Sequence, residues 1–168
     1  TLAAGLAVRE TLNDLGCRAS LEWPNDLLLD GKKVAGILTE TSTRGLRMDA
    51  IALGIGLNVN GEPPPELALR ATSLRLACGR VFELADVAAQ LCARLEGWID
   101  RAVAGGAPVV VDAFRRDSGM IGQRVEVAAH GQSRRGIARD IAADGALLVE
   151  DADGLMFRVV SGEVEQLP

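Results

Sequence analysis

Apolar side chains recur at helical spacing over the first fifteen residues of the chain. Leucine and valine occupy one face from Leu2 to Leu15, and Gly16 is typical of the residue that follows the end of a helix. The same spacing returns over residues 84–99, and two glycines at 105–106 end it. A shorter apolar repeat at residues 109–116 predicts a third helix.

Four apolar segments between the first two helices predict β-strands. They lie at residues 19–23, 27–29, 34–41 and 50–59, and Asp30-Gly31 is the sequence of a tight hairpin turn. The last segment is almost continuously apolar, as in a strand that is buried in a sheet. Helices and hairpin strands in this order predict an α+β fold, in which helices pack on a mixed or antiparallel sheet.

The pattern changes after residue 118, where the apolar segments become shorter and glycine turns more frequent. Short strands between such turns predict a small β-barrel. We therefore expect two domains, at residues 1–118 and 119–168. So small a barrel buries only a marginal core alone, and we expect it to dock on the first sheet. Seven apolar side chains are expected to point into the barrel: Val125, Val127, Ile137, Ile141, Leu147, Val149 and Val159.

The net charge of the chain is −5, and its isoelectric point is about 4.9. Nonspecific binding to nucleic acid or to an anionic membrane needs an excess of lysine and arginine, so this balance argues against both kinds of partner. No stretch is apolar enough to span a membrane.

The cysteines and the single histidine offer little chemistry by their positions. Cys17, Cys78 and Cys92 have no metal-like spacing, and we expect reduced cysteines, as in a cytoplasmic protein. His130 lies in a turn-like sequence, which argues against catalysis by histidine.

The densest polar cluster is Trp23-Pro24-Asn25-Asp26, at the end of a predicted strand. One interpretation is a hairpin corner in which Asn25 and Asp26 cap their own backbone. The other is a pocket edge, where Asp26 holds Mg²⁺ through its oxygens. These residues alone leave both open.

Lys33 and Gly36 lie in the returning strand. Strict alternation places Lys33, Ala35 and Ile37 on one face, and Val34, Gly36 and Leu38 on the other. A lysine ammonium suits a phosphate or carboxylate, and a glycine lets a ligand approach the backbone. An edge-strand lysine beside a glycine bulge is the structural alternative.

The segment Gly54-Ile55-Gly56-Leu57-Asn58 suggests a nucleotide-binding glycine motif only superficially. It is not a dinucleotide fingerprint, because the third glycine is absent and a proline-rich loop follows where a helix should begin. Asn58, at the end of the strand, could hydrogen-bond a base edge or cap a turn.

Taken together, these motifs resemble the biotin protein ligase family in order and spacing. The resemblance rests on Trp23-Pro24-Asn25-Asp26, on residues 33–38, on residues 54–60 and on Ala71-Thr72-Ser73-Leu74, and the tail from Gly122 to Leu167 resembles the family's C-terminal barrel. It implies a biotin/lipoate ligase core related to class II synthetases, followed by a small SH3-like β-barrel. It also implies a cytoplasmic enzyme and leaves a homodimer open.

The resemblance implies ATP-dependent attachment of biotin to a lysine of a biotin carboxyl carrier protein, through biotinyl-AMP. Lys33 would be the catalytic residue, in contact with the biotin carboxylate and the α-phosphate. The remaining expected ligand contacts are the biotin pocket at Gly36, Ile37 and Leu38, the glycine motif at Gly56, the adenine contact at Asn58, and the phosphate and Mg²⁺ contacts at Asn25 and Asp26.

Two features depart from the family pattern. Glu22 stands where the family usually has lysine, which replaces a positive charge near the ATP phosphates at a cost of about 1 kcal/mol or more. The family's glycine- and arginine-rich loop and the first strands of its sheet are expected upstream of Thr1, so we expect this chain to be an incomplete ligase. Alternatives are a noncatalytic module that binds the carrier protein, and a lipoate-attaching relative.

Overall fold

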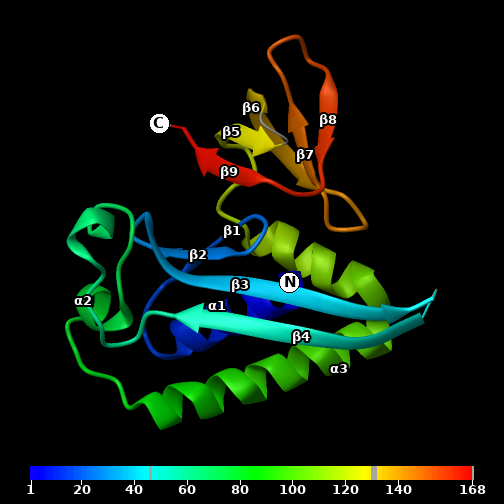
Figure 1. The fold of residues 1–168 in the computed structure, drawn as a ribbon. Helices are drawn as coiled ribbons and strands as arrows, with labels where there is room; N and C mark the ends of the chain where they lie inside the picture. The colour runs from blue at the N-terminus through cyan, green and yellow to red at the C-terminus, as the bar shows by residue number, and fades with distance from the viewer. Residues whose placement is uncertain (46, 130–131, 168) are drawn as a thin grey trace.

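The computed structural model describes residues 1–45, 47–129 and 132–167. It contains a four-stranded sheet covered by helices and a separate five-stranded sheet of shorter strands (Figure 1). The elements of the first part are α1 (Leu2–Asp14), β1 (Ser20–Glu22), β2 (Asp26–Leu29), β3 (Lys32–Arg44), β4 (Arg47–Leu57), the 3-10 helix η1 (Pro65–Leu67), α2 (Leu74–Cys78) and α3 (Leu84–Asp117). Those of the second are β5 (Arg124–Ala129), β6 (Gln132–Ile141), β7 (Leu147–Glu150), β8 (Met156–Val159) and β9 (Glu163–Gln166).

The first sheet is antiparallel, with the strand order β1-β2-β3-β4, and α1 and α3 lie together on one of its faces (Figure 1). Leu6 and Leu12 of α1 and Phe114 of α3 are almost completely buried between helices and sheet. The predicted α+β fold is confirmed. α3 also contains the predicted interruption, because Gly106 has a left-handed φ of 71° that no helical residue adopts.

The turn between β2 and β3 shows why this hairpin forms. Asp30 and Gly31 both have positive φ, 50° and 76°, as a two-residue type I′ turn requires. Aspartate tolerates this region better than most residues, and glycine meets no steric cost there. The turn therefore fixes the alignment of β2 with β3, which carries four of the eight expected site residues.

The second sheet is antiparallel with the order β8-β7-β6-β5-β9. Six of the seven side chains expected inside are buried. Ile137 is the exception, since Ala138 is the fully buried residue at that place in β6. Ala138 pairs directly with the buried Val149, so the inward face of β6 includes Ala138 and excludes its neighbour.

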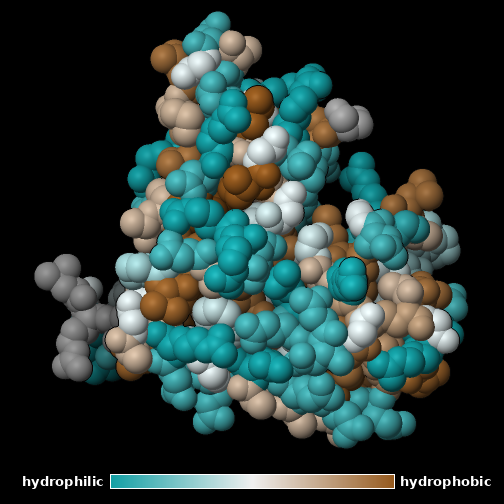
Figure 2. All heavy atoms as spheres, turned by 180° about the vertical axis from the view of Figure 1, so that it is seen from behind, coloured by the Kyte–Doolittle hydropathy of each residue, from teal (hydrophilic) through white to brown (hydrophobic). Residues whose placement is uncertain are grey.

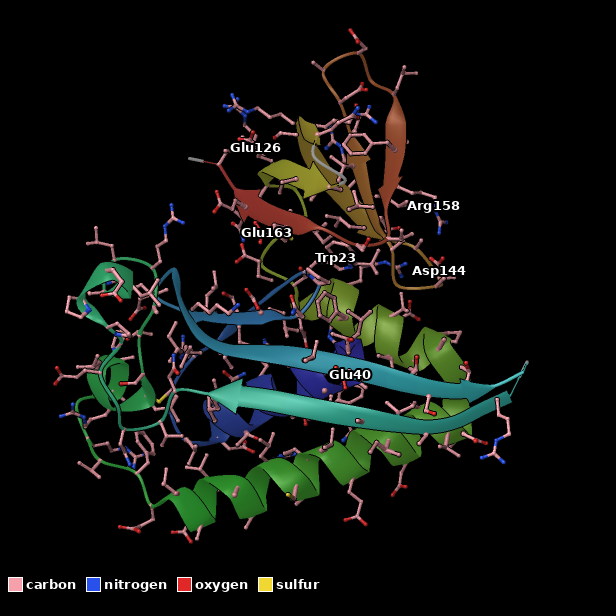
Figure 3. The ribbon with its side chains drawn as sticks, in the orientation of Figure 1. Trp23, Glu40, Glu126, Asp144, Arg158 and Glu163 are labelled. Carbon is pink, nitrogen blue, oxygen red and sulfur yellow. A yellow bond between two sulfur atoms is a disulfide. The ribbon has the colours of Figure 1, made fainter. Side chains whose placement is uncertain are left out.

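The second sheet docks on the first part through specific polar contacts. The indole Nε1 of Trp23 donates a hydrogen bond to the carbonyl of Gly145 at 2.8 Å (Figure 3). Arg115 of α3 forms an ion pair with Asp140 and donates to the carbonyl of Ile141 at 2.5 Å. In the docked arrangement, β9 lies on the side of the second sheet that faces the β1–β2 hairpin (Figure 1).

One expectation about individual residues changes, and another cannot be compared with the structure. Cys17 and Cys78 form a disulfide, while Cys92 is free and exposed, so the expectation that all three are reduced is wrong. The two partners were not evident because 61 residues separate them and only the packing of α2 brings them together. His130 lies outside the described residues.

Seen from behind, the molecule is mostly hydrophilic, with hydrophobic residues in small separate groups (Figure 2). No helix in the described part of the chain is long and apolar enough to cross a membrane.

Candidate active site

The turn between β1 and β2 is fixed on both sides. Trp23 is only 3% exposed, and its peptide bond with Pro24 is cis. Asn25 is held against β3, because its Nδ2 donates to the carbonyl of Ile37 and its own carbonyl accepts from the Ile37 N–H, both at 2.9 Å. This turn brings Glu22 and Asp26 opposite each other across the β1–β2 ladder.

A β-bulge in β3 changes the face on which Lys33 lies. Leu27 of β2 pairs with Ala35 and the next residue, Leu28, pairs with Lys33, so Val34 is an extra residue in the ladder. Val34 and Ala35 are both buried, and Lys33 is exposed. The expectation that Lys33 shares a face with Ala35 and Ile37 is therefore wrong.

Lys33 instead shares its face with Gly36. A Cβ placed on Gly36 would lie 3.2 Å from Cε of Lys33 and 3.5 Å from Oδ1 of Asp26. The absent side chain of Gly36 thus makes room for the Lys33 side chain to lie across the sheet toward Asp26. This role differs from the expected one, in which Gly36 only gave a ligand access to the backbone.

Lys33 and Asp26 form an ion pair with Nζ 2.6 Å from Oδ2. The Lys33 side chain is 49% exposed, so the pair is open to solvent on one side. Such a pair contributes roughly 0–1 kcal/mol to stability. A stabilising role is therefore too small to explain why Lys33 and Asp26 lie together. The second Asp26 oxygen, Oδ1, is buried and has no hydrogen-bond partner among the described residues.

A shallow groove of about 450 Å³ runs along β3 and β4 beside this pair. Gly36 pairs with Gly56, and Leu38 pairs with Gly54, so glycines form much of its floor. Leu38 is 64% exposed along one side, while the Ile37 side chain is buried in the core and Ile37 borders the groove from β3. The groove suits a flat, mostly apolar ligand. Its lining residues are Asn25, Gly36, Ile37, Leu38, Gly54, Ile55 and Gly56.

A larger cleft of about 900 Å³ lies between the β1–β2 hairpin and β9. Asn25 lines both hollows, and Lys33 and Asp26 line the cleft, so the ion pair stands where the two meet. Glu163 and Glu165 of β9 lie on the opposite wall, and Figure 3 shows Glu163 on the side of β9 toward the hairpin. Four acidic and two basic residues line the cleft, so its charge is negative on balance, whereas no charged residue lines the groove.

Glu22 is a half-buried carboxyl in this cleft. Burial raises its pKa above the ordinary value, and the nearby Asp26 and Glu165 carboxylates raise it too, while a hydrogen bond with Gln166 and the charge of Lys33 act in the opposite direction. Glu22 contacts the C-terminal sheet through Gln166 and does not turn away from the cleft. The expected conflict with ATP phosphates therefore remains.

Asn58 follows the end of β4 and lines neither hollow. Its Nδ2 donates to the carbonyl of Thr72 at 3.1 Å, and its carbonyl accepts from the Leu74 N–H at 2.9 Å. Asn58 therefore joins the strand end to the residues before α2. Asn58 was expected either to hydrogen-bond a base edge or to cap a turn, and these hydrogen bonds agree with the capping role.

Within the described residues, no group of three or more histidine, cysteine, aspartate or glutamate side chains could hold a metal ion. The Asp26 carboxylate, with one unpartnered oxygen, fits Mg²⁺ only as a single protein ligand. This is how Mg²⁺ usually binds beside a nucleotide, with phosphates and waters completing its shell.

Both parts of the chain match models of known families. Residues 1–58 match the Biotin/lipoate A/B protein ligase family, and residues 120–166 match the Biotin protein ligase C terminal domain. The biotin–[acetyl-CoA-carboxylase] ligase of Paracoccus denitrificans is 32% identical over 165 residues, which cover 92% of this chain and 67% of that protein. This chain belongs to the biotin protein ligase family.

Other members of the family align over nearly the whole chain. The Mycobacterium tuberculosis biotin–[acetyl-CoA-carboxylase] ligase is 36% identical over 172 residues, covering 99% of this chain and 62% of that protein. The Bacillus subtilis bifunctional ligase/repressor BirA is 32% identical over 170 residues, covering 98% of this chain. The chain spans about half, 52%, of that relative's length.

The fold matches a solved family member closely. The biotin protein ligase from Aquifex aeolicus in complex with biotin and ATP superposes with a TM-score of 0.85 at 27% identity, over 99% of this chain and 69% of that one. The match includes both sheets, since it covers almost every residue.

The structure brings most of the predicted site residues together at the groove and the ion pair: Asn25, Asp26, Lys33, Gly36, Ile37, Leu38 and Gly56. Asn58 stands apart. Sequence reasoning missed the contribution of β9, whose Glu165 and Gln166 face Glu22. No local pattern marks them, because they lie more than a hundred residues away in the chain and reach the cleft only through docking of the second sheet.

Proposed function

We propose that this chain provides the biotin- and ATP-binding surface of a biotin–[biotin carboxyl-carrier protein] ligase. The observation that carries the proposal is the glycine-floored groove that ends at the Lys33–Asp26 pair, in a chain of this family. Biotin lies in the groove with its carboxylate toward Lys33. ATP lies with its α-phosphate at the same ammonium.

The reaction has two steps that share this site. A carboxylate oxygen of biotin attacks the α-phosphorus of ATP, and the bond to pyrophosphate breaks. A lysine amine of the carrier protein then attacks the biotinyl carbonyl, and AMP leaves as the amide forms. Both steps concentrate negative charge on phosphate oxygens.

Lys33 stabilises that charge by position. Its ammonium, aligned by Oδ2 of Asp26, faces the junction of groove and cleft and needs little reorganisation when charge develops. Asp26, with its unpartnered Oδ1, would hold the Mg²⁺ that accompanies ATP. The ion would offset phosphate charge, which partly compensates for Glu22.

The test is a pair of assays on the full-length protein that contains this chain. Biotin-dependent exchange of pyrophosphate into ATP measures the first step, and transfer of labelled biotin to a carrier domain measures the second. We expect both. Exchange that depends on lipoate in place of biotin would make the protein a lipoate-attaching relative, and tight carrier binding without exchange would make it a noncatalytic module.

A further inference from the structure

The disulfide between Cys17 and Cys78 joins two elements on the helical side of the first part. Cys17 follows α1 and is 3% exposed, and Cys78 is the last residue of α2. Their Cα atoms are 6.2 Å apart, a separation that a disulfide spans without backbone movement. A sulfur stick is visible beside α2 in Figure 3.

Apart from the disulfide, α2 is attached mainly at its N-terminal end, where the N–H groups of Leu74 and Arg75 donate to the carbonyls of Asn58 and Val59. It is a five-residue helix, and among its side chains only Leu74 is buried, whereas Leu76 is 48% exposed. Residues 64–70 are all exposed, while Thr72 and Ser73, directly before the helix, are buried. The covalent bond at Cys78 is therefore the strongest restraint on the C-terminal end of this helix.

Residues 70–78, which end with α2, border the candidate active site. The Lys33 N–H donates to the carbonyl of Arg70 at 2.8 Å, and the Thr72 N–H donates to the carbonyl of Lys33 at 2.9 Å. The same segment accepts the Asn58 side-chain hydrogen bond at Thr72. Residues 70–74 thus hold the backbone of Lys33 and the end of β4 together.

We propose that Cys17 and Cys78 form a reversible redox site that regulates ligand binding through residues 70–78. The cosubstrate is a cellular dithiol. One of its thiolates attacks the Cys78 sulfur, which is the more accessible of the two, and Cys17 leaves as the thiolate. The second thiol of the cosubstrate then displaces Cys78, so the protein gains two electrons and two protons and the dithiol becomes a disulfide.

The consequence for the site rests on the proposed function. In the oxidised protein, α2 is fixed to α1, and residues 70–74 keep the backbone of Lys33 in place. In the reduced protein, Leu74 and the backbone hydrogen bonds remain, and the segment opens more often. We expect reduction to weaken ATP and biotin binding on the order of fivefold, the lower end of the range for coupled sites.

The test begins with the bond itself. The purified chain, oxidised by a glutathione disulfide buffer or reduced by dithiothreitol, is alkylated and analysed by mass spectrometry, and hydrogen exchange is followed at residues 70–78. We expect Cys17 and Cys78 to be protected from alkylation only in the oxidised form. Exchange at residues 70–78 should be faster after reduction. Equal alkylation of Cys17 and Cys78 in both buffers would overturn the proposal, whereas the free Cys92 is expected to react in both.

Variants separate the redox site from the proposed function. Cys78→Ser and Cys17→Ala should make hydrogen exchange at 70–78 fast in either buffer, and the exposed Cys92→Ser is the matched control that keeps the redox response. Calorimetric titrations of the full-length protein that contains this chain, with biotin and with ATP, report the coupling. No binding in either redox state would contradict the proposed function, whereas unchanged exchange or equal affinities in the two states would contradict the redox proposal.

Discussion

Nζ of Lys33 lies 2.6 Å from Oδ2 of Asp26, although Lys33 and Gly36 would lie on opposite faces of an unbroken strand. The bulge at Val34 moves Lys33 to the face of Gly36 and of the groove. The ion pair thus depends on one extra residue in β3 and on the missing side chain of Gly36. Both features place a positive charge at the end of an apolar groove.

A side chain that fills the groove should weaken biotin binding. Gly56→Val places two methyl groups over its floor, and valine is favoured in strands, so the fold should persist. A Cβ at Gly56 meets only the Gly36 carbonyl, at 3.8 Å. We expect biotin affinity, measured by calorimetry, to fall about tenfold or more, a loss of roughly 1.4 kcal/mol.

Ala52→Val is the matched control for this substitution. Ala52 lies on the same strand, four residues before Gly56, and so on the same face, but it does not line the groove. It should leave the affinity unchanged. An equal loss in the two variants would indicate a general effect on β4 and would remove the groove from the account.

Glu22 predicts a pH-dependent difference in stability. Its pKa is raised in the folded protein, chiefly by burial, so between the unfolded and folded pKa values the folded state binds more protons than the unfolded state. The free energy of unfolding therefore decreases as pH rises through this range, and remains lower above it. Glu22→Gln should raise the unfolding free energy at pH 7, with a smaller difference from wild type near pH 4.

Urea denaturation at the two pH values measures this difference. The control is Glu96→Gln, which neutralises an exposed carboxyl of α3 without the burial of Glu22. If Glu22→Gln is no more stable than wild type at pH 7, the carboxyl costs nothing in its buried position. The interpretation of Glu22 as an unfavourable charge would then be wrong.

The contact of Arg115 with the second sheet predicts a structural effect. Arg115→Ala removes the ion pair with Asp140 and the hydrogen bond to the Ile141 carbonyl, which should cost about 1–3 kcal/mol of unfolding free energy. Arg116→Ala is the control, because Arg116 pairs only with its neighbour Asp117 among the described residues.

The same substitution, Arg115→Ala, should also affect activity. Because β9 forms one wall of the cleft, we expect the rate of transfer to the carrier protein to fall more than the affinity for biotin. The reverse order would make the second sheet unimportant for transfer.

The sequence motifs predicted the groove better than the ion pair. Residues 36–38 lie in β3, and Gly54 and Gly56 lie in β4, which pairs with it. Both segments are predicted as consecutive strands of one sheet, so their proximity could be foreseen. The face of Lys33 could not, because alternation breaks at a bulge and nothing in the local sequence marks its position.

Contacts between elements that are far apart in the chain were the other feature that the sequence did not predict. Glu165 and Gln166 reach Glu22, and Cys78 reaches Cys17, through packing of elements that are far apart in the chain. The helix α2 that carries Cys78 has only five residues, too few for a periodic pattern to reveal. Such contacts depend on how elements dock, which residue spacing does not encode.

The central claim is that Lys33 acts on the reacting phosphate and has no equivalent role in folding. Lys33→Ala and Lys32→Ala form a matched pair, because the neighbouring Lys32 directs its ammonium away from the site, to the carbonyl of Ala68 at 2.8 Å. A charge-assisted contact to the transition state contributes about 2–4 kcal/mol, so Lys33→Ala should slow the reaction roughly 30-fold or more. Neither substitution should change the free energy of unfolding by more than about 1 kcal/mol.

The most direct measurement is therefore the steady-state rate of biotin-dependent ATP–pyrophosphate exchange for wild type, Lys33→Ala and Lys32→Ala in the full-length protein that contains this chain. The account predicts a loss of about 30-fold or more for Lys33→Ala and almost none for Lys32→Ala. The edge-strand alternative for Lys33 is already wrong, because β3 pairs with β2 on one side and with β4 on the other. A loss below about threefold for Lys33→Ala, or equal losses for the two lysines, would show that Lys33 has no catalytic role and would contradict the account.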